Sequence, residues 1–268
     1  AGVSNMGKGH PIGTPILTLG GWKNIEHLQL KEDILGQDGQ RHSITGIFPR
    51  GKQPCYRFTF TDKSSVEVDS DHLWTIRKRW GRKTFNWLTK STKEIIDLYG
   101  YFGKYNKNRI EIPICESLNF PRECVPLSPY LLGLLLGDGK LGDGTPIFST
   151  ADEELLSEFT RQGFRVSQRS KYDYGISGIL DIIRSLEINE RSKEKFIPSL
   201  YKFNAKEIRL AILRGLMDTD GYISKQGWCE FTSISKQLAE DVRFLVQSLG
   251  GRVSFNTKAF NKYTYKGE

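Results

Sequence analysis

The sequence lacks the patterns that mark a zinc protein, a secreted protein or a membrane protein. Its four cysteines (Cys55, Cys115, Cys124 and Cys229) form no Cys-x-x-Cys pair, and its four histidines are scattered, which argues against zinc or a His-rich metal site. We expect incidental or buried thiols in a reducing compartment. No apolar run reaches membrane-spanning length, and the N-terminus has no signal-peptide core. These absences predict a soluble, cytoplasmic protein without a membrane partner.

Positive charge is concentrated in one segment of the chain. Residues 77–110 hold ten basic and two acidic residues, so their net charge equals the +8 of the whole chain. Aromatic residues such as Trp80 and Trp87 lie between the basic ones. This mixture suits a phosphate backbone and base faces, although a solvated basic face on a small subdomain is the alternative. The residues that we expect to bind DNA are Arg77, Lys78, Arg79, Arg82, Lys83, Lys90 and Lys93.

The pattern of short apolar runs changes near residues 120–128. Before that boundary, residues 9–76 read as β-rich runs, including one at 43–48 and a hairpin turn at 36–40. After it, helices alternate with strands. Ser128 and Pro129 predict the N-cap and first turn of a helix over 129–138. The other expected elements include a helix at 205–221 and a strand at 251–258.

Two stretches of the second part repeat each other. Leu-Leu-Gly-Leu-Leu-Leu-Gly-Asp-Gly at 131–139 aligns with Leu-Arg-Gly-Leu-Met-Asp-Thr-Asp-Gly at 213–221. Glycine inside a helix costs roughly 1 kcal/mol relative to alanine, so Gly133 and Gly215 predict two helices whose backbones approach closely. Such a pair would bring Asp138 and Asp220 together at its C-terminal end.

Paired carboxylates at helix C-termini repel each other and meet the negative end of each helix dipole. That arrangement favours a bound divalent cation, because carboxylates, phosphate oxygens and waters are suitable Mg²⁺ ligands. Metal-assisted hydrolysis of a phosphodiester is the chemistry that follows. A plain core helix with a turn is the alternative for either stretch alone, and the matched pair argues against it.

The two stretches resemble the paired motifs of LAGLIDADG homing endonucleases. Leu136 departs from the first acid of that motif, whereas Asp138 and Asp220 stand at the metal-binding position. The segment 195–221 resembles the element before the second motif in intein-borne members, which places the active-site lysine at Lys195. The resemblance implies Mg²⁺-dependent cleavage of both strands of a long double-stranded DNA site.

The first part of the chain resembles an intein. Residues 9–40 resemble the first conserved intein block, and residues 66–76 resemble the block whose histidine assists the N-terminal acyl shift, which maps to His72. Gly9 stands where inteins usually carry a Cys or Ser nucleophile. The pattern is similar to the intein class that lacks this nucleophile and carries a marker tryptophan, here Trp74. Packing in the core is the alternative for Trp74.

Together these resemblances predict an all-β Hint-like splicing domain followed by an α+β LAGLIDADG endonuclease domain. The endonuclease domain is expected to have two pseudo-symmetric αββαββα-type halves, of which the second is incomplete. The expected divisions are host sequence at 1–8, the N-terminal part of the Hint domain at 9–76, a basic DNA-recognition segment and linker at 77–125, and the endonuclease domain at 126–268, with halves at about 126–204 and 205–268.

We expect a monomer that does not splice alone, either because the sequence is a truncated intein or because a separate C-terminal intein fragment completes it. The alternatives are a splicing element whose nuclease has decayed into a DNA-binding domain, and a DNA-binding protein without catalysis. Retention of Asp138, Asp220 and Lys195 argues against decay.

Overall fold

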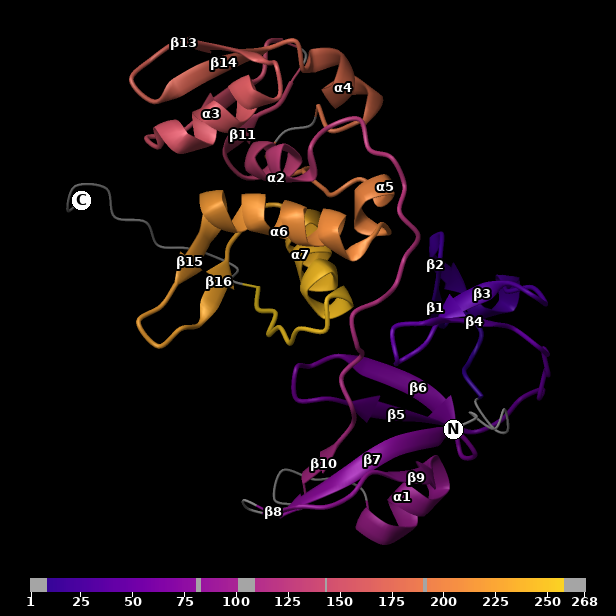
Figure 1. Ribbon diagram of the computed structural model, residues 1–268. Helices are drawn as coiled ribbons and strands as arrows, with labels where there is room; N and C mark the ends of the chain where they lie inside the picture. Colours follow the sequence, from indigo (N-terminus) through magenta and orange to yellow (C-terminus); the bar gives the residue numbers. More distant parts are fainter. Residues whose placement is uncertain (1–8, 81–82, 101–108, 143, 190–191, 258–268) are drawn as a thin grey trace.

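The computed structural model describes residues 9–80, 83–100, 109–142, 144–189 and 192–257. The chain has a mixed α/β fold with several small antiparallel sheets. In Figure 1 the N-terminal strands form the lower part of the molecule, and helices α2 (Pro129–Asp138) and α6 (Lys206–Asp220) lie one above the other in the upper part.

The N-terminal part consists of short antiparallel strands. One sheet has the order β2-β1-β3-β4, and β5 pairs with β6 beside it. Their bounds are β1 Pro15–Thr18, β2 Gly21–Asn24, β3 Asp33–Leu35, β4 Arg41–Ser43, β5 Cys55–Thr59 and β6 Ser65–Asp69, with a 3-10 turn, η1, at Ile25–His27. The predicted hairpin turn is confirmed, since Gly36 N–H donates to Gln40 O at 2.8 Å.

The predicted strand at 43–48 is wrong beyond Ser43. Strand β4 ends there. One residue further on, Ile44 N–H still donates a hydrogen bond to Glu32 O, just before β3. The following apolar residues contribute little to a core, because Ile47 and Phe48 are 49% and 79% exposed. The β-like composition of this run therefore does not produce a strand.

Strand β7 (Leu73–Trp80) joins the β-rich part to the basic segment. It pairs with β9 (Leu88–Ser91) over its first half, and with β8 (Lys83–Thr84) and β10 (Arg109–Glu111) over its second half. Helix α1 (Thr92–Tyr99) follows β9 through a capping box of Ser91 and Glu94. This continuous strand crosses the expected division at 76/77.

Residues 112–128 contain no helix or strand and connect the two parts of the molecule. Glu116 N–H and Asn119 N–H donate to Gln37 O at 2.9 Å and Gly39 O at 2.7 Å. Between these bonds, Leu118 N–H donates to Ser248 O at 2.9 Å. The connection is therefore hydrogen-bonded to both the β3–β4 hairpin and the second part.

The second part begins with the predicted helix α2, and Pro129 is its first residue. Ser128 is the N-cap residue, but its side chain makes no capping hydrogen bond. The order α2-β11-β12-α3-β13-β14-α4 follows, and its strands form the sheet β11-β12-β14-β13. The bounds are β11 Gly139–Lys140, β12 Ile147–Ser149, α3 Glu153–Arg161, β13 Arg165–Gln168, β14 Asp173–Ser177 and α4 Leu180–Ser185.

A second series of elements starts with α5 (Ser199–Lys202) and α6, and continues with β15 (Gly221–Ile223), β16 (Cys229–Phe231) and α7 (Lys236–Ser248). The predicted strand at 251–258 is absent from residues 251–257, while residue 258 lies outside the described residues. After α7 the chain turns sharply. Gly250 has a φ of 86°, and Gly251 N–H bonds back to Val246 O at 2.8 Å.

Two hydrophobic cores hold these parts. The large one surrounds α2 and α6, where the five leucines of α2 are at most 1% exposed, and it extends to Phe148 and Phe159. The small one lies under β6 and β7 and contains Val68, Trp74, Ile76 and Ile95. The expectation of a buried apolar helix at 129–138 is confirmed.

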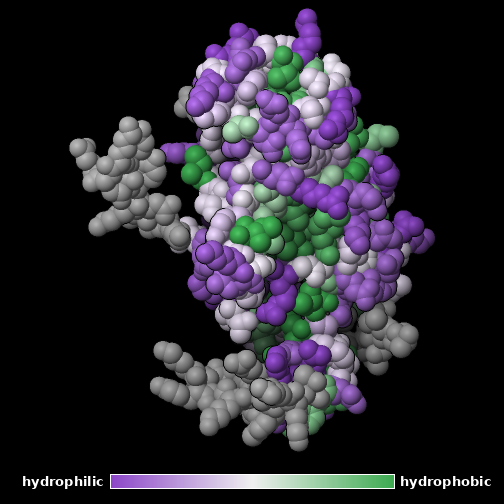
Figure 2. All heavy atoms as spheres, turned by 60° about the vertical axis from the view of Figure 1, so that its left-hand side comes forward, coloured by the Kyte–Doolittle hydropathy of each residue, from purple (hydrophilic) through white to green (hydrophobic). Residues whose placement is uncertain are grey.

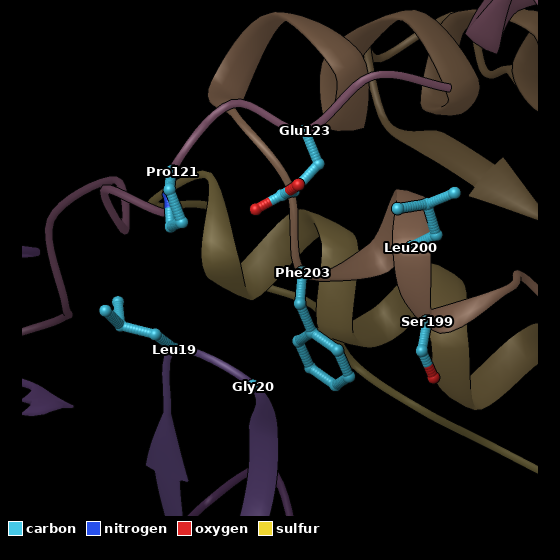
Figure 3. A pocket seen from close by; sticks show the side chains of 7 residues that line it. All are labelled: Leu19, Gly20, Pro121, Glu123, Ser199, Leu200 and Phe203. Atoms are coloured by element: carbon cyan, nitrogen blue, oxygen red, sulfur yellow. The ribbon is translucent and has the colours of Figure 1, made fainter. Parts of the chain in front are cut away.

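The β1–β2 turn contacts the second part of the molecule. Gly21 has a φ of 109° and a methyl group there would lie 2.7 Å from the Phe203 ring, while Trp22 lies 6.2 Å from Phe244 between ring centroids. Figure 3 shows the shallow cleft beside this contact, about 260 Å³ in volume. Its lining residues are Leu19, Gly20, Pro121, Glu123, Ser199, Leu200 and Phe203.

Candidate functional site

Helices α2 and α6 cross at their glycines. A methyl group on Gly133 would lie 2.9 Å from Gly215 Cα and 3.0 Å from Leu216 N. The reverse holds for Gly215, where a methyl group would lie 3.0 Å from Gly133 Cα and 2.8 Å from Leu134 N. The close approach predicted from these two glycines is confirmed, and it allows both helices to end beside each other.

Asp138 and Asp220 are the last residues of α2 and α6. Desolvation raises the pKa of both carboxyls, and repulsion from Asp138 raises that of Asp220 further. The side chain of Asp138 is nevertheless exposed and that of Asp220 is partly buried, so a ligand can reach them. The structure therefore brings these two acids together.

Lys195 lies beside the two acids and is only 6% exposed. Its Nζ donates to Gly137 O at 2.8 Å, and its own carbonyl accepts from Ser235 Oγ at 2.6 Å. Burial lowers the pKa of Lys195 to about 8, although Asp220 and then Asp138 oppose that effect. A buried lysine held in this way can change its protonation state near neutral pH.

The donor set at the helix ends fits a hard divalent cation. Mg²⁺ is usually held by one or two carboxylates, and substrate phosphates and waters complete its octahedron. Asp138 and Asp220 can supply that number. Among the described residues, no group of three or more His, Cys, Asp or Glu side chains offers a metal site made entirely of protein. The site thus suits a metal that is shared with a phosphate ligand.

The three residues predicted for splicing lie in one neighbourhood of the N-terminal part. Gly9 O accepts from Asp69 N–H at 3.1 Å. The ring centroids of His10 and His72 lie 4.8 Å apart, and those of His72 and Trp74 lie 4.9 Å apart. Trp74 is also a core residue, and its Nε1 donates to the buried Thr92 Oγ1 at 3.0 Å.

Sequence reasoning missed an acid at this place. A methyl group on Gly9 would overlap the Asp69 carboxylate, whose more distant oxygen, Oδ1, would still be only 3.0 Å away. Arg50 Nη1 donates to Asp69 Oδ2 at 2.9 Å and its Nη2 donates to Asp71 Oδ2 at 2.7 Å. Nothing in the sequence pattern links residue 50 to residue 69, because the contact depends on the fold.

The predicted DNA-binding side chains do not share one face. Alternation along β7 places Arg77 and Arg79 on one face and Lys78 on the other. Arg77 Nε and Arg79 Nη1 donate to the Glu111 carboxylate at 2.7 and 3.3 Å, and these contacts, that of Arg77 first, lower the pKa of Glu111. Arg77 also lies 4.6 Å from the centre of the Trp87 ring.

The remaining predicted DNA-binding residues have mixed surroundings. Lys90 Nζ donates to Glu94 Oε1 at 2.7 Å, and Lys93 is exposed at the start of α1. Arg82 and the side chain of Lys83 lie outside the described residues. Neighbouring basic side chains of β7 therefore point to opposite faces, and Glu111 neutralises part of their charge.

Figure 2 shows the face reached by turning the β15–β16 side forward, where hydrophobic groups gather near the middle of a largely hydrophilic surface. Large apolar side chains are exposed in and around the β15–β16 hairpin. Those most exposed are Tyr222, Ile223, Trp228 and Ile234. No helix among the described residues has the length and apolar character needed to span a bilayer.

Comparison with known proteins identifies the domain that contains α6. Residues 207–266 match the LAGLIDADG-like domain family, so a LAGLIDADG-like domain is present at the C-terminal end of the chain. The match includes Asp220, whereas Asp138 and Lys195 precede it.

A relative covers more of the chain. Over 271 residues the chain is 25% identical to a replicative DNA helicase DnaB from Mycobacterium intracellulare. That similarity covers 94% of this chain and 44% of the relative, so the chain spans less than half of the relative's length.

Proposed function

We propose that this chain carries a site-specific homing endonuclease within an intein and that it hydrolyses both strands of its DNA target with Mg²⁺. The observation that carries the proposal is the convergence of Asp138, Asp220 and Lys195 at the crossing of α2 and α6. The LAGLIDADG-like domain at 207–266 supports the same reaction class. The alternative hypothesis is a splicing element whose endonuclease domain has decayed, so that it still binds DNA but no longer cleaves it.

The residues divide the chemistry between them. Asp138 and Asp220 would hold Mg²⁺ through their carboxylates, and their mutual repulsion would then be relieved. Bound Mg²⁺ supplies charge neutralisation at the scissile phosphate and activation of water. Lys195, when protonated, would stabilise negative charge that develops on the phosphate. Because the side chain is buried, water competes little with the phosphate for its ammonium group.

Long-range attraction to DNA comes from the excess positive charge. The chain has a formal net charge of +8, and binding through phosphates should weaken steeply as salt rises. Arg79 and Lys93 are the exposed members of the predicted set whose side chains the structure describes. We propose a monomer in the cytoplasm that acts on double-stranded DNA.

A plasmid assay tests the endonuclease. The substrate is a plasmid that carries the uninterrupted replicative helicase gene of the source organism, chosen because the similarity to DnaB favours a replicative helicase as the host. We expect linear product with Mg²⁺ and none with EDTA. A matched plasmid whose gene is interrupted by the coding sequence of this chain should stay uncut. Salt-sensitive binding without cleavage of the first plasmid would support the decayed alternative.

We further propose that residues 9–76 contribute the N-terminal part of a protein-splicing domain and that residues 1–8 are host sequence. The geometry around Gly9, His72 and Trp74 supports this proposal. Because residue 9 has no side-chain nucleophile, the attacking group would come from another segment. A C-terminal intein fragment is the proposed partner that completes the domain.

Splicing is tested by co-expression with the part of the DnaB relative that follows the aligned region. We expect release of the first eight residues or their ligation to the partner's host sequence, measured by mass spectrometry. His72→Ala should prevent both products, whereas Cys55→Ala, at an exposed cysteine, should not. Absence of both products with the unaltered chain would contradict the splicing proposal without affecting the endonuclease.

A further inference from the structure

We propose that Gly137 and Thr219 form a complementary pair of positioning residues that sets the separation of Asp138 and Asp220. The inference rests on the proposed endonuclease function and concerns how that site is held in shape. The two residues face each other across α2 and α6, one turn beyond the Gly133–Gly215 crossing. Each immediately precedes one of the two acids.

No side chain fits at residue 137 while Thr219 is present. A methyl group on Gly137 would lie 2.7 Å from Thr219 Cβ and 3.4 Å from Cγ2, and it would overlap Oγ1. The contact involves the base of the Thr219 side chain rather than a flexible end. A larger residue 137 would therefore push the helices apart instead of displacing one rotamer.

Thr219 is itself fixed. Its hydroxyl donates to Gly215 O and Leu216 O of the preceding turn, at 3.1 Å each. A hydroxyl that bonds back to its own helix holds the side chain in one rotamer. The Thr219 side chain thus acts as a spacer of fixed size. It packs against Gly137, which has only a hydrogen atom in place of a side chain.

The peptide unit after Gly137 connects this contact to the catalytic groups. Gly137 O accepts from Lys195 Nζ at 2.8 Å, and the next residue is Asp138. Displacement of Gly137 would therefore move the lysine anchor and one carboxylate together. Mg²⁺ tolerates little change in ligand geometry, since its oxygen distances are confined to about 2.0–2.1 Å.

Helix propensity alone predicts the opposite effect of a substitution. Gly137 lies within α2 with an ordinary negative φ, and alanine is more favourable than glycine in a helix. If Gly137 had no special contact, Gly137→Ala would raise Tm. The contact with Thr219 predicts a lower Tm, and it predicts that removal of the threonine side chain compensates.

The test is a double-mutant cycle of Gly137→Ala, Thr219→Gly and both together, because Thr219 Cβ itself would lie 2.7 Å from the added methyl group and must also be removed. For Gly137→Ala we expect Tm to fall by about 5 °C. Below that Tm, we expect plasmid cleavage at saturating DNA to slow by tenfold or more, with the KM for DNA unchanged. The rise in Tm on adding Mg²⁺ should shrink as well. The double variant should recover the rate to within about threefold, together with the Mg²⁺ response.

A control variant and the Tm measurements distinguish failure of the packing inference from failure of the proposed endonuclease function. Gly20→Ala, where the nearest atom to an added methyl group lies 3.9 Å away, should leave Tm, rate and Mg²⁺ response unchanged. Gly137→Ala with unchanged or raised Tm, or a double variant no better than Gly137→Ala, would overturn the inference. If the unaltered chain cuts no plasmid, the endonuclease proposal fails, while the Tm cycle with and without Mg²⁺ still decides the packing.

Discussion

Replacing Asp220 with asparagine is expected to slow DNA cleavage by about 1,000-fold or more and, at the same time, to raise the Tm of the metal-free protein. The first effect follows because one of two metal-holding carboxylates is lost at the reacting phosphate. The second follows because desolvation and repulsion from Asp138 both raise the pKa of Asp220. The charged form is therefore disfavoured in the folded state.

The pH dependence has a definite sign. A carboxyl whose folded pKa is raised above its unfolded value of 3.8 stabilises the fold fully only below that value. This stability is lost as pH rises through the folded pKa, so at neutral pH the metal-free protein bears the whole cost. Asp220→Asn removes the cost, and the Tm difference between variant and parent should grow from pH 4 to pH 7, measured in EDTA.

Two further variants sharpen the measurement. Asp218→Asn changes a carboxylate in the same helix that accepts from Tyr130 Oη at 2.7 Å and lies on the exposed side, so cleavage should persist. Lys195→Met should slow cleavage by about 100-fold without weakening plasmid binding. Cleavage by Asp220→Asn within tenfold of the parent would contradict the role of the acid pair, and full activity of Lys195→Met would contradict that of the lysine.

Replacing Arg209 with methionine is expected to produce the largest loss of stability. Arg209 is 0% exposed, and burial lowers its pKa to about 10. Its guanidinium donates to Asn204 O at 2.8 Å, to Ser248 O at 2.7 Å, to Ser248 Oγ at 2.6 Å and to Leu118 O. These acceptors belong to the residue just before the N-cap of α6, the end of α7 and the 112–128 connection, so one side chain joins three segments.

Methionine fills much of the space but removes the guanidinium donors of Asn204 O and Leu118 O, whereas Ser248 O keeps its bond from Leu118 N–H. Each buried unsatisfied acceptor costs about 1–3 kcal/mol, and removal of a buried charge offsets part of the sum. We expect a net loss of about 3 kcal/mol and a Tm lower by roughly 10 °C. Calorimetry measures both quantities, and limited proteolysis should show faster cleavage within residues 112–128.

Arg214→Met is the matched control for this prediction. Arg214 lies on the same helix with an exposed side chain, so its replacement should change stability by less than about 0.5 kcal/mol. Equal Tm values for the two variants would show that burial and hydrogen bonding of Arg209 contribute nothing beyond helix surface effects.

The helix pair could be predicted from the sequence because its determinants are local. Five leucines with Gly133 indicate a buried helix with a close neighbour, and the repeat around Gly215 identifies that neighbour. Contacts between distant segments could not be predicted. The hydrogen bonds of Arg50 with Asp69 and of Arg209 with Leu118 O depend on how distant loops are placed in the fold. Sequence periodicity carries no information about that placement.

The basic segment shows a different limit of sequence reasoning. Composition correctly located the charge, but it could not show that Arg77 and Lys78 point to opposite faces of β7 or that Glu111 pairs across from Arg77. The strand at 251–258 failed for a related reason. Its residues have strand-like alternation, yet a strand forms only where a partner edge is available.

Strand β7 has an evolutionary consequence. It carries Trp74 in the small core at one end and the arginines at the other. A descendant that shed everything after the 112–128 connection would still inherit the arginines, because they continue the strand that carries Trp74. Under the proposed function, a shortened splicing element would therefore keep a remnant of DNA recognition long after its nuclease had disappeared.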